Sequence, residues 1–297
     1  MNALEKEREE VDSSVDQSYL ESAPDVPEID ILPSSGLFDL RLSDLWQYRE
    51  LLFFLTWRDV KVRYKQTVLG AAWAVLQPLL TMLIFTVIFG RLAGLPSDGV
   101  PYPIFTFTAL LPWQLFAYAL TQSSTSLVAD QNLITKIYFP RLVIPLSSVL
   151  SGLVDFIIAF AVLVGLIIIY GIPISWRWFT LPPLVFFALL TAISVGLWLS
   201  ALNVQYRDVR YTLPFLTLVW MYATPIAYSS SLVPPQWQAL YALNPMTGVV
   251  EGFRWAILGK GGEIGPMILV SVAVVLLLFF GGLLYFKRME DSFADMV

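Results

Sequence analysis

The stretch WRDVKVRYKQTVLGAAW, residues 57–73, changes character halfway along and decides the class of the protein. Its first nine residues hold five charged side chains: Arg58, Asp59, Lys61, Arg63 and Lys65. No further charge occurs until Arg91. An uncharged run of this length exceeds the roughly 20 residues that a helix needs to cross the hydrocarbon core of a bilayer. The stretch therefore predicts a membrane span with a basic cluster directly before it.

The composition of the whole chain indicates an integral membrane protein. Of its 297 residues, 57% are apolar and 14% are charged, whereas a soluble domain carries about 25% charged residues. The chain has no cysteine and no histidine. Disulfides, thiolate metal sites and histidine-based acid–base chemistry are thereby excluded, so we expect no catalytic site and no metal site.

Apolar blocks predict an all-α fold with six transmembrane helices. The expected spans are residues 68–90, 103–125, 142–170, 178–202, 212–229 and 264–286, of which the fifth is marginal in length. We divide the chain into an acidic disordered tail (1–40), an amphipathic interface helix (41–66) and a six-span permease domain (67–297). The tail holds eleven acidic and two basic residues. It has too few apolar residues for their burial to offset the entropy that folding would cost.

The distribution of lysine and arginine predicts the orientation in the membrane. Fourteen of these residues fall on the side of both termini and four on the other side. Because cytoplasmic loops carry the positive excess, we expect both termini to lie in the cytoplasm.

The helix predicted before the first span has a polar stripe formed by Gln47, Glu50, Arg58, Lys61 and Lys65 at 100° per residue. Apolar and aromatic side chains cover much of the remaining surface, which suits the membrane–water interface. The alternative is a short cytosolic helix packed on a soluble partner.

Residues 226–263, between the fifth and sixth spans, lie outside and are largely apolar. We expect short helices there that lie on or dip into the outer leaflet, with helix-ending signals at Asn244-Pro245 and Gly259. The alternative is an ordinary packed loop.

A single ionisable residue, Asp155, falls deep in a predicted span. Such a group faces the interior of a bundle or a wet cavity. It is either a structural hydrogen-bond partner for a neighbouring helix or a polar contact for substrate or proton.

No phosphate-binding loop of the form G-x-x-x-x-G-K-[ST] occurs in the sequence, so a pump would need a separate ATPase. Two short cytoplasmic loops carry specific polar residues that a motor could push against, although topological charge alone would also account for them. These residues are Asp130, Gln131, Asn132, Lys136, Arg207 and Asp208.

Four segments, in this order, resemble the membrane subunits of polysaccharide ABC exporters, which export O-antigen, capsule or teichoic acid. They are RDVKVRYKQTVLGAAWAVLQPLL (58–80), NLITKIYFPRLVIPLSSVL (132–150), ALNVQYRDVRY (201–211) and LNPMTGVVEGFRWAILG (243–259). The resemblance covers residues 41–290. The acidic tail departs from the pattern, because it is longer than members of this family usually carry.

The resemblance implies a homodimer joined by two copies of a P-loop ATPase, which would hold ATP and magnesium; this chain would need no cofactor. It implies a gate helix, residues 45–65, with the functional candidates Trp57, Arg58, Lys61, Arg63 and Lys65. It places the coupling helix at residues 129–139 and a second contact at Arg207 and Asp208. The first and fifth spans would line a channel, for which our candidates are Trp73, Phe85, Trp220, Tyr222 and Tyr228.

We therefore expect a multi-pass permease of the bacterial inner membrane that moves lipid-linked polysaccharide and has no nucleic-acid partner. The basic cluster before the first span could attract a pyrophosphate-linked lipid carrier. Two alternatives stay open: an exporter of another lipid or small molecule, and a polytopic glycan polymerase or ligase. The second would need catalytic groups in the external loop, which offers only Glu251, Arg254, Lys260 and Glu263.

Overall fold

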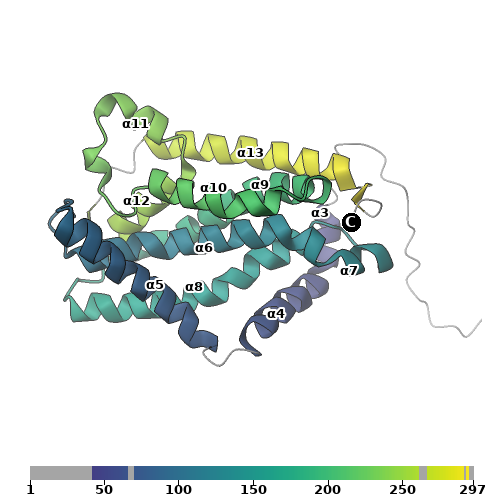
Figure 1. The fold of residues 1–297 in the computed structure, drawn as a ribbon, viewed down its shortest axis with the longest axis horizontal. Helices are drawn as coiled ribbons and strands as arrows, with labels where there is room; N and C mark the ends of the chain where they lie inside the picture. The colour runs from purple at the N-terminus through teal and green to yellow at the C-terminus, as the bar shows by residue number, and fades with distance from the viewer. Residues whose placement is uncertain (1–41, 66–69, 261–265, 291, 294–297) are drawn as a thin grey trace, which may run out of the picture. The chain divides into compact units, whose positions relative to one another are not determined.

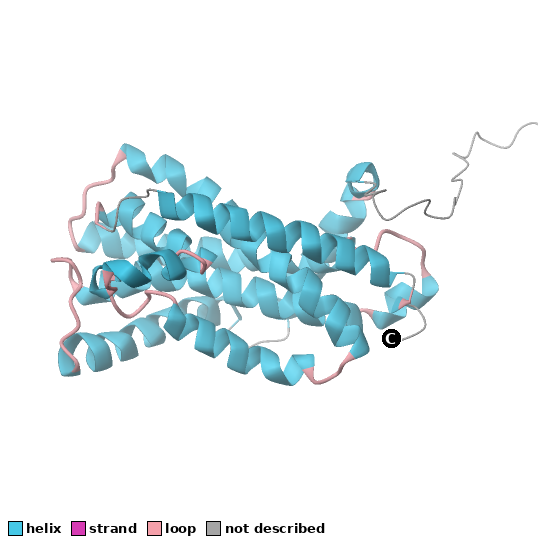
Figure 2. Cartoon of the chain, turned by 90° about the horizontal axis from the view of Figure 1, so that it is seen from above, coloured by secondary structure: helices cyan, strands magenta, loops and turns pink. Residues whose placement is uncertain are grey.

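The computed structural model describes residues 42–65, 70–260, 266–290 and 292–293. The described residues form helices and contain no strand, which confirms the all-α prediction (Figure 1). The tail predicted for residues 1–40 lies outside them. Viewed from above in Figure 2, the helices of the bundle run side by side and most connecting loops gather at their two ends.

The segment before the first span is helical but is not one continuous helix. Helix α3 (Leu42–Gln47) and helix α4 (Arg49–Lys65) are separated at Tyr48. Helix α4 packs on α8, buries Leu55 and Val60, and leaves Phe53 and Phe54 largely exposed. Apolar side chains thus occur on both its packed and its exposed face.

Five helical segments among the described residues are long and apolar enough to cross a membrane: Ala72–Leu92, Tyr102–Ala129, Val143–Ile169, Trp176–Gln205 and Ile268–Glu290. They correspond to five of the six predicted spans. The first combines α5 (Gly70–Phe85) with the π-helix η1 (Thr86–Leu92). The others are α6 (Tyr102–Ala129), α8 (Val143–Ile169), η2 (Trp176–Thr180) continued by α9 (Leu181–Gln205), and α13 (Pro266–Glu290).

The predicted fifth span, 212–229, was too long. Helix α10 (Val209–Ala223) has 15 residues and stops six positions before the expected end. The reason is Pro225, because a residue that precedes proline is driven out of the helical region. Thr224 accordingly adopts an extended backbone with φ −99° and ψ 141°. At 1.5 Å per residue α10 spans about 22 Å, less than the roughly 30 Å of a hydrocarbon core.

Helix α6 forms the centre of the bundle. It packs on α8, α9 and α12. In its apolar 18-residue stretch 78% of the residues are buried, compared with 11% in the corresponding stretch of the first span. Close approach of α6 and α9 depends on Gly196, since a Cβ atom there would come 2.5 Å from the Ser123 Oγ. Small residues at such contacts are typical of helices that pack inside membranes.

The segment between α10 and α13 contains the expected short helices. They are η3 (Ser230–Leu232), α11 (Pro235–Tyr241) and α12 (Pro245–Leu258). The Asn244 side chain caps the start of α12 by accepting a hydrogen bond from the Met246 amide, and Gly259 ends it in the left-handed conformation at φ 67°. Helix α12 does not lie on the surface; it is largely buried against α6, α9 and α13.

Candidate functional site

An ion pair connects the helix before the first span to the end of α6. Arg58 Nη2 lies 2.8 Å from Asp130 Oδ2 and also 2.8 Å from Asp59 Oδ1. Asp130 stands at the corner between α6 and the short helix α7 (Gln131–Lys136). The hydrogen bond to Asp130 raises the pKa of the Arg58 guanidinium, and burial raises the pKa of the Asp59 carboxyl against the opposing effect of Arg58. The predicted gate helix and the predicted coupling helix are thus in direct contact.

A second polar contact joins the end of α4 to the middle of α8. Arg63 Nη1 lies 2.6 Å from Asp155 Oδ2, and the Tyr64 hydroxyl donates a hydrogen bond to the same carboxylate. The Arg63 guanidinium also lies over the Tyr118 ring, 4.2 Å from its centroid. Burial raises the pKa of the Tyr64 hydroxyl, and the bond to Asp155 acts in the same direction. Of the two interpretations of Asp155, the structure favours the contact with a neighbouring helix.

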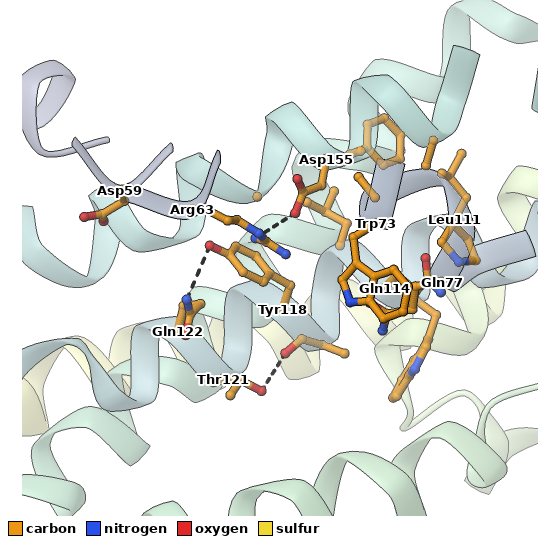
Figure 3. A pocket seen from close by; sticks show the side chains of 18 of the residues that line it. Asp59, Arg63, Trp73, Gln77, Leu111, Gln114, Tyr118, Thr121, Gln122 and Asp155 are labelled. Atoms are coloured by element: carbon orange, nitrogen blue, oxygen red, sulfur yellow. Dashed lines mark hydrogen bonds and ion pairs between the residues drawn. The ribbon is translucent and has the colours of Figure 1, made fainter. Parts of the chain in front are cut away.

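A cavity of about 1290 Å³ opens between α4, α5, α6 and α8. Helix α4 contributes Arg58 and Arg63 to its wall and α8 contributes Asp155. Helices α5 and α6 contribute aromatic and amide side chains, among them Trp73, Gln77 and Gln114 (Figure 3). Both ion pairs therefore form part of the cavity wall. The amide and aromatic side chains of the wall include Trp73, Gln77, Gln114, Tyr118 and Gln122.

The other predicted residues of α4 and of the cytoplasmic loops are exposed. The Lys61 ammonium lies 5.6 Å from the centroid of the Trp57 ring, and Lys65 also points outward. Gln131, Asn132 and Lys136 lie on α7, which has one buried residue, Ile134.

The turn between α9 and α10 holds Arg207 and Asp208, both exposed. It lies at the same end of the bundle as α7 in Figure 1. The same end receives the last turn of α13, where the Glu290 carboxylate accepts a hydrogen bond from the Arg141 amide. The structure thus places the two predicted coupling loops at one end of the bundle.

The five channel candidates fall into different environments. Trp73 and Tyr222 are 56% and 55% exposed. Phe85 is 7% exposed and packs edge-on against Phe89, which is the environment of a core residue and not of a channel surface. Trp220 is half-buried: its ring contacts Phe116 at 4.9 Å.

The remaining candidate, Tyr228, belongs to a polar cluster at the opposite end of the bundle. Its hydroxyl lies 2.7 Å from the Tyr241 hydroxyl, and its backbone carbonyl accepts a hydrogen bond from Arg254 Nη1 at 3.2 Å. Arg254 also donates to the Ile226 carbonyl at 2.9 Å and pairs with Glu251 at 3.1 Å. The guanidinium is 1% exposed and lies over the Phe105 ring, 3.6 Å from its centroid.

Sequence reasoning missed several residues of these sites. It treated Arg254 only as one of four charged groups in an external loop, and it assigned no role to Tyr64, Gln77 or Gln114. One available signal was the placement of Gln77 and Gln114 inside predicted spans, where an uncharged polar group needs a partner.

Comparison with known proteins identifies the family. Residues 50–258 match the model of the ABC-2 type transporter family. The chain is 31% identical over 251 residues to an O-antigen export system permease protein RfbA of Klebsiella pneumoniae, covering 84% of this chain and 95% of the relative. It is 29% identical to the RfbA protein of Myxococcus xanthus, over 86% and 98% of the two chains.

A more distant relative is the polysialic acid transport protein KpsM of Escherichia coli, 26% identical over 78% of this chain and 91% of the relative. The matched region contains all of α4 but its first residue, the corner at Asp130, the α9–α10 turn and α12. The family resemblance expected from the four sequence segments is therefore confirmed. This multi-pass inner-membrane chain belongs to the ABC-2 type transporter family and is one of its membrane permease subunits.

Proposed function

We propose that this chain is the membrane subunit of an ATP-driven exporter that moves lipid-linked polysaccharide out across the inner membrane. The functions for which the relatives are named, O-antigen export and polysialic acid transport, support a glycan as cargo. Two copies of the chain form the channel, and two copies of a separate P-loop ATPase supply ATP, magnesium and work. The chain itself catalyses no reaction, and both of its termini lie in the cytoplasm.

The observation that carries this proposal is the contact between Arg58 and Asp130. A motor that pushes on α7 moves the corner at Asp130, and the ion pair passes that displacement to α4, directly before the first span. Ion pairs with good geometry transmit motion because their energy depends on distance and orientation. In this mechanism α4 is the gate, and the exposed polar residues of α7 and of the α9–α10 turn contact the ATPase.

Two lysines of the basic cluster are the candidates for binding the pyrophosphate of a lipid carrier. Arg58 and Arg63 are paired with carboxylates, whereas Lys61 and Lys65 present their ammonium groups on the exposed side of α4. Lys61 and Lys65 are therefore the groups that we propose attract an anionic lipid carrier.

Deletion and complementation test the function. Loss of the gene should abolish surface polysaccharide while lipid-linked polysaccharide accumulates inside the cell, and the wild-type gene should restore export. The purified permease should form a stable complex with a P-loop ATPase subunit. Surface polysaccharide that persists after deletion would refute the proposal.

A second experiment separates the lysines from the arginines. Lys61→Gln combined with Lys65→Gln should lower export severalfold and leave assembly with the ATPase intact, as measured by co-purification. Unchanged export would reject the role of these lysines without affecting the wider proposal. Arg49→Gln, which changes another exposed cation before the first span, is the matched control.

A further inference from the structure

The cavity between α4, α5, α6 and α8 collects the amide side chains that lie within the membrane-spanning helices α5 and α6. Gln77 of α5 and Gln114 and Gln122 of α6 all line it. An amide buried in an apolar environment without a partner costs several kcal/mol on the scale of transfer to hydrocarbon, about 4–8. Three amides that face one cavity therefore indicate that the cavity contains water or a polar ligand.

Two of these amides have unused hydrogen-bonding capacity. Within the residues that the structure describes, no hydrogen bond joins the side chain of Gln77 or of Gln114 to another group, and Gln122 Nε2 makes one contact of 3.4 Å with the Tyr118 hydroxyl. Each primary amide offers two N–H donors and a carbonyl acceptor. A ligand with alternating donors and acceptors would use both functions.

The charged side chains of the cavity wall are paired with one another and carry a net charge of −1, which decides against an anion as the ligand. The wall contains two cations, Arg58 and Arg63, and three carboxylates, Asp59, Asp130 and Asp155. Arg58 is paired with Asp59 and Asp130, and Arg63 is paired with Asp155. Phosphate and carboxylate ligands require an excess of donors or positive charge, whereas a neutral polyol requires neither.

Aromatic rings complete the wall. Trp73 of α5 is 56% exposed although it stands in a membrane-spanning helix, and it lines the cavity. Tyr118 of α6 lies below the Arg63 guanidinium. Figure 3 shows Trp73, Gln77 and Gln114 gathered on one side of the cavity, away from Asp59. A pyranose ring presents C–H groups on its faces and hydroxyl groups on its rim, and these match an indole face with amides beside it.

We propose that this cavity is a binding site for neutral sugar units of the exported glycan. Trp73 provides the stacking surface, and Gln77 and Gln114 bind the hydroxyl groups. This proposal rests on the proposed function, because it assumes that the protein exports a glycan. The volume of the cavity, about 1290 Å³, exceeds the roughly 300–1,000 Å³ of common small-molecule sites and accommodates more than one sugar ring.

Cysteine labelling tests the site, because the chain contains no native cysteine. Gln114→Cys and Gln77→Cys are introduced singly into the full-length protein in its native host. The rate of modification by N-ethylmaleimide is measured in cells that make the polysaccharide and in cells whose first glycosyltransferase is deleted. We expect modification at both positions to be at least threefold slower in the glycan-producing cells. Gln205→Cys, an exposed position at the end of α9 outside the cavity, should react at the same rate in both strains.

Each outcome bears on the proposal. Equal rates at both cavity positions in the two strains would overturn it, and so would absence of labelling in both strains, which would show a cavity closed to water. If Gln114→Cys does not accumulate, Gln77→Cys carries the same comparison. Failure of the proposed function has a different signature, since deletion of the permease gene would then leave the surface polysaccharide unchanged.

Functional variants give an independent measurement. Gln114→Leu and Trp73→Leu should reduce surface polysaccharide at least fivefold with normal membrane levels of the protein, whereas Gln205→Leu should not. Wild-type export by both cavity variants would also overturn the proposal.

Discussion

Arg58 and Asp130, which are 72 positions apart in sequence, form a hydrogen-bonded ion pair of 2.8 Å between α4 and the α6–α7 corner. The pair lies at the junction of the two segments for which the family resemblance implies different tasks, gating and coupling. Through this contact, a displacement of one segment is passed on to the other.

Arg58→Gln and Asp130→Asn should each lower export, and the double variant should be little worse than either single one. In a double-mutant cycle of thermal unfolding we expect a coupling free energy of about 1 kcal/mol, because the side chains are partly shielded from solvent. Arg49→Gln on the same helix should change neither quantity. Strictly additive effects of the two substitutions would contradict a coupled pair.

Asp155→Asn should destabilise the protein more than Tyr64→Phe does. The first change removes the carboxylate that pairs with Arg63 and accepts from Tyr64, whereas the second removes one hydrogen bond. We expect a loss of about 1–3 kcal/mol for Asp155→Asn and about 1 kcal/mol for Tyr64→Phe. Thermal unfolding in detergent, followed by size-exclusion fluorescence, measures both, with exposed Glu50→Gln as the control. The reverse order of effects would show that the carboxylate is not the centre of this contact.

Gly196→Ala should separate α6 from α9 and destabilise the bundle by about 1–3 kcal/mol. A Cβ atom would come 2.5 Å from the Oγ and 3.0 Å from the Cβ of Ser123, which is fully buried. Gly165→Ala in α8 is the matched control, because nothing lies within 4 Å of its Cβ position. There a helix-interior glycine becomes alanine, so stability should rise by about 0.5–1 kcal/mol. Similar melting temperatures for the two variants would contradict the close packing of α6 on α9.

Arg254→Met should be the most damaging of these substitutions. It leaves the Ile226 and Tyr228 carbonyls and the Glu251 carboxylate without the guanidinium that binds them. Removing one partner of a buried ion pair costs about 3–5 kcal/mol, so we expect little protein in the membrane. Combining the change with Glu251→Gln should recover part of the yield, as measured by immunoblot of membranes. Equal yields of single and double variants would show that the lost carbonyl contacts dominate.

The spans could be predicted from sequence because each is a long apolar run whose only structural solution in lipid is a helix. The fifth span was predicted too long because apolarity continues past Pro225, while the helix cannot. The interface helix was predicted as one element, and only the structure shows the interruption at Tyr48.

The sequence predicted several residues of the candidate site, but it did not predict which of them contact one another. The sequence indicated Arg58 and Asp130 separately, because no local periodicity relates residues that far apart. Phe85 shows the opposite problem: an aromatic residue in the first span has the same sequence signature whether it faces a channel or packs on Phe89. The convergence of Gln77 and Gln114 likewise depends on how α5 crosses α6, which hydropathy does not determine.

The short length of α10 has a consequence for how the protein is made. Beyond Ala223 the backbone leaves the helix while still buried, and the carbonyl of Ile226 depends on a side chain that is synthesised 28 residues later. A nascent chain that has reached α10 therefore exposes peptide groups that neither lipid nor its own helix can satisfy. The Ile226 carbonyl therefore gains this hydrogen bond only after α12 has been synthesised.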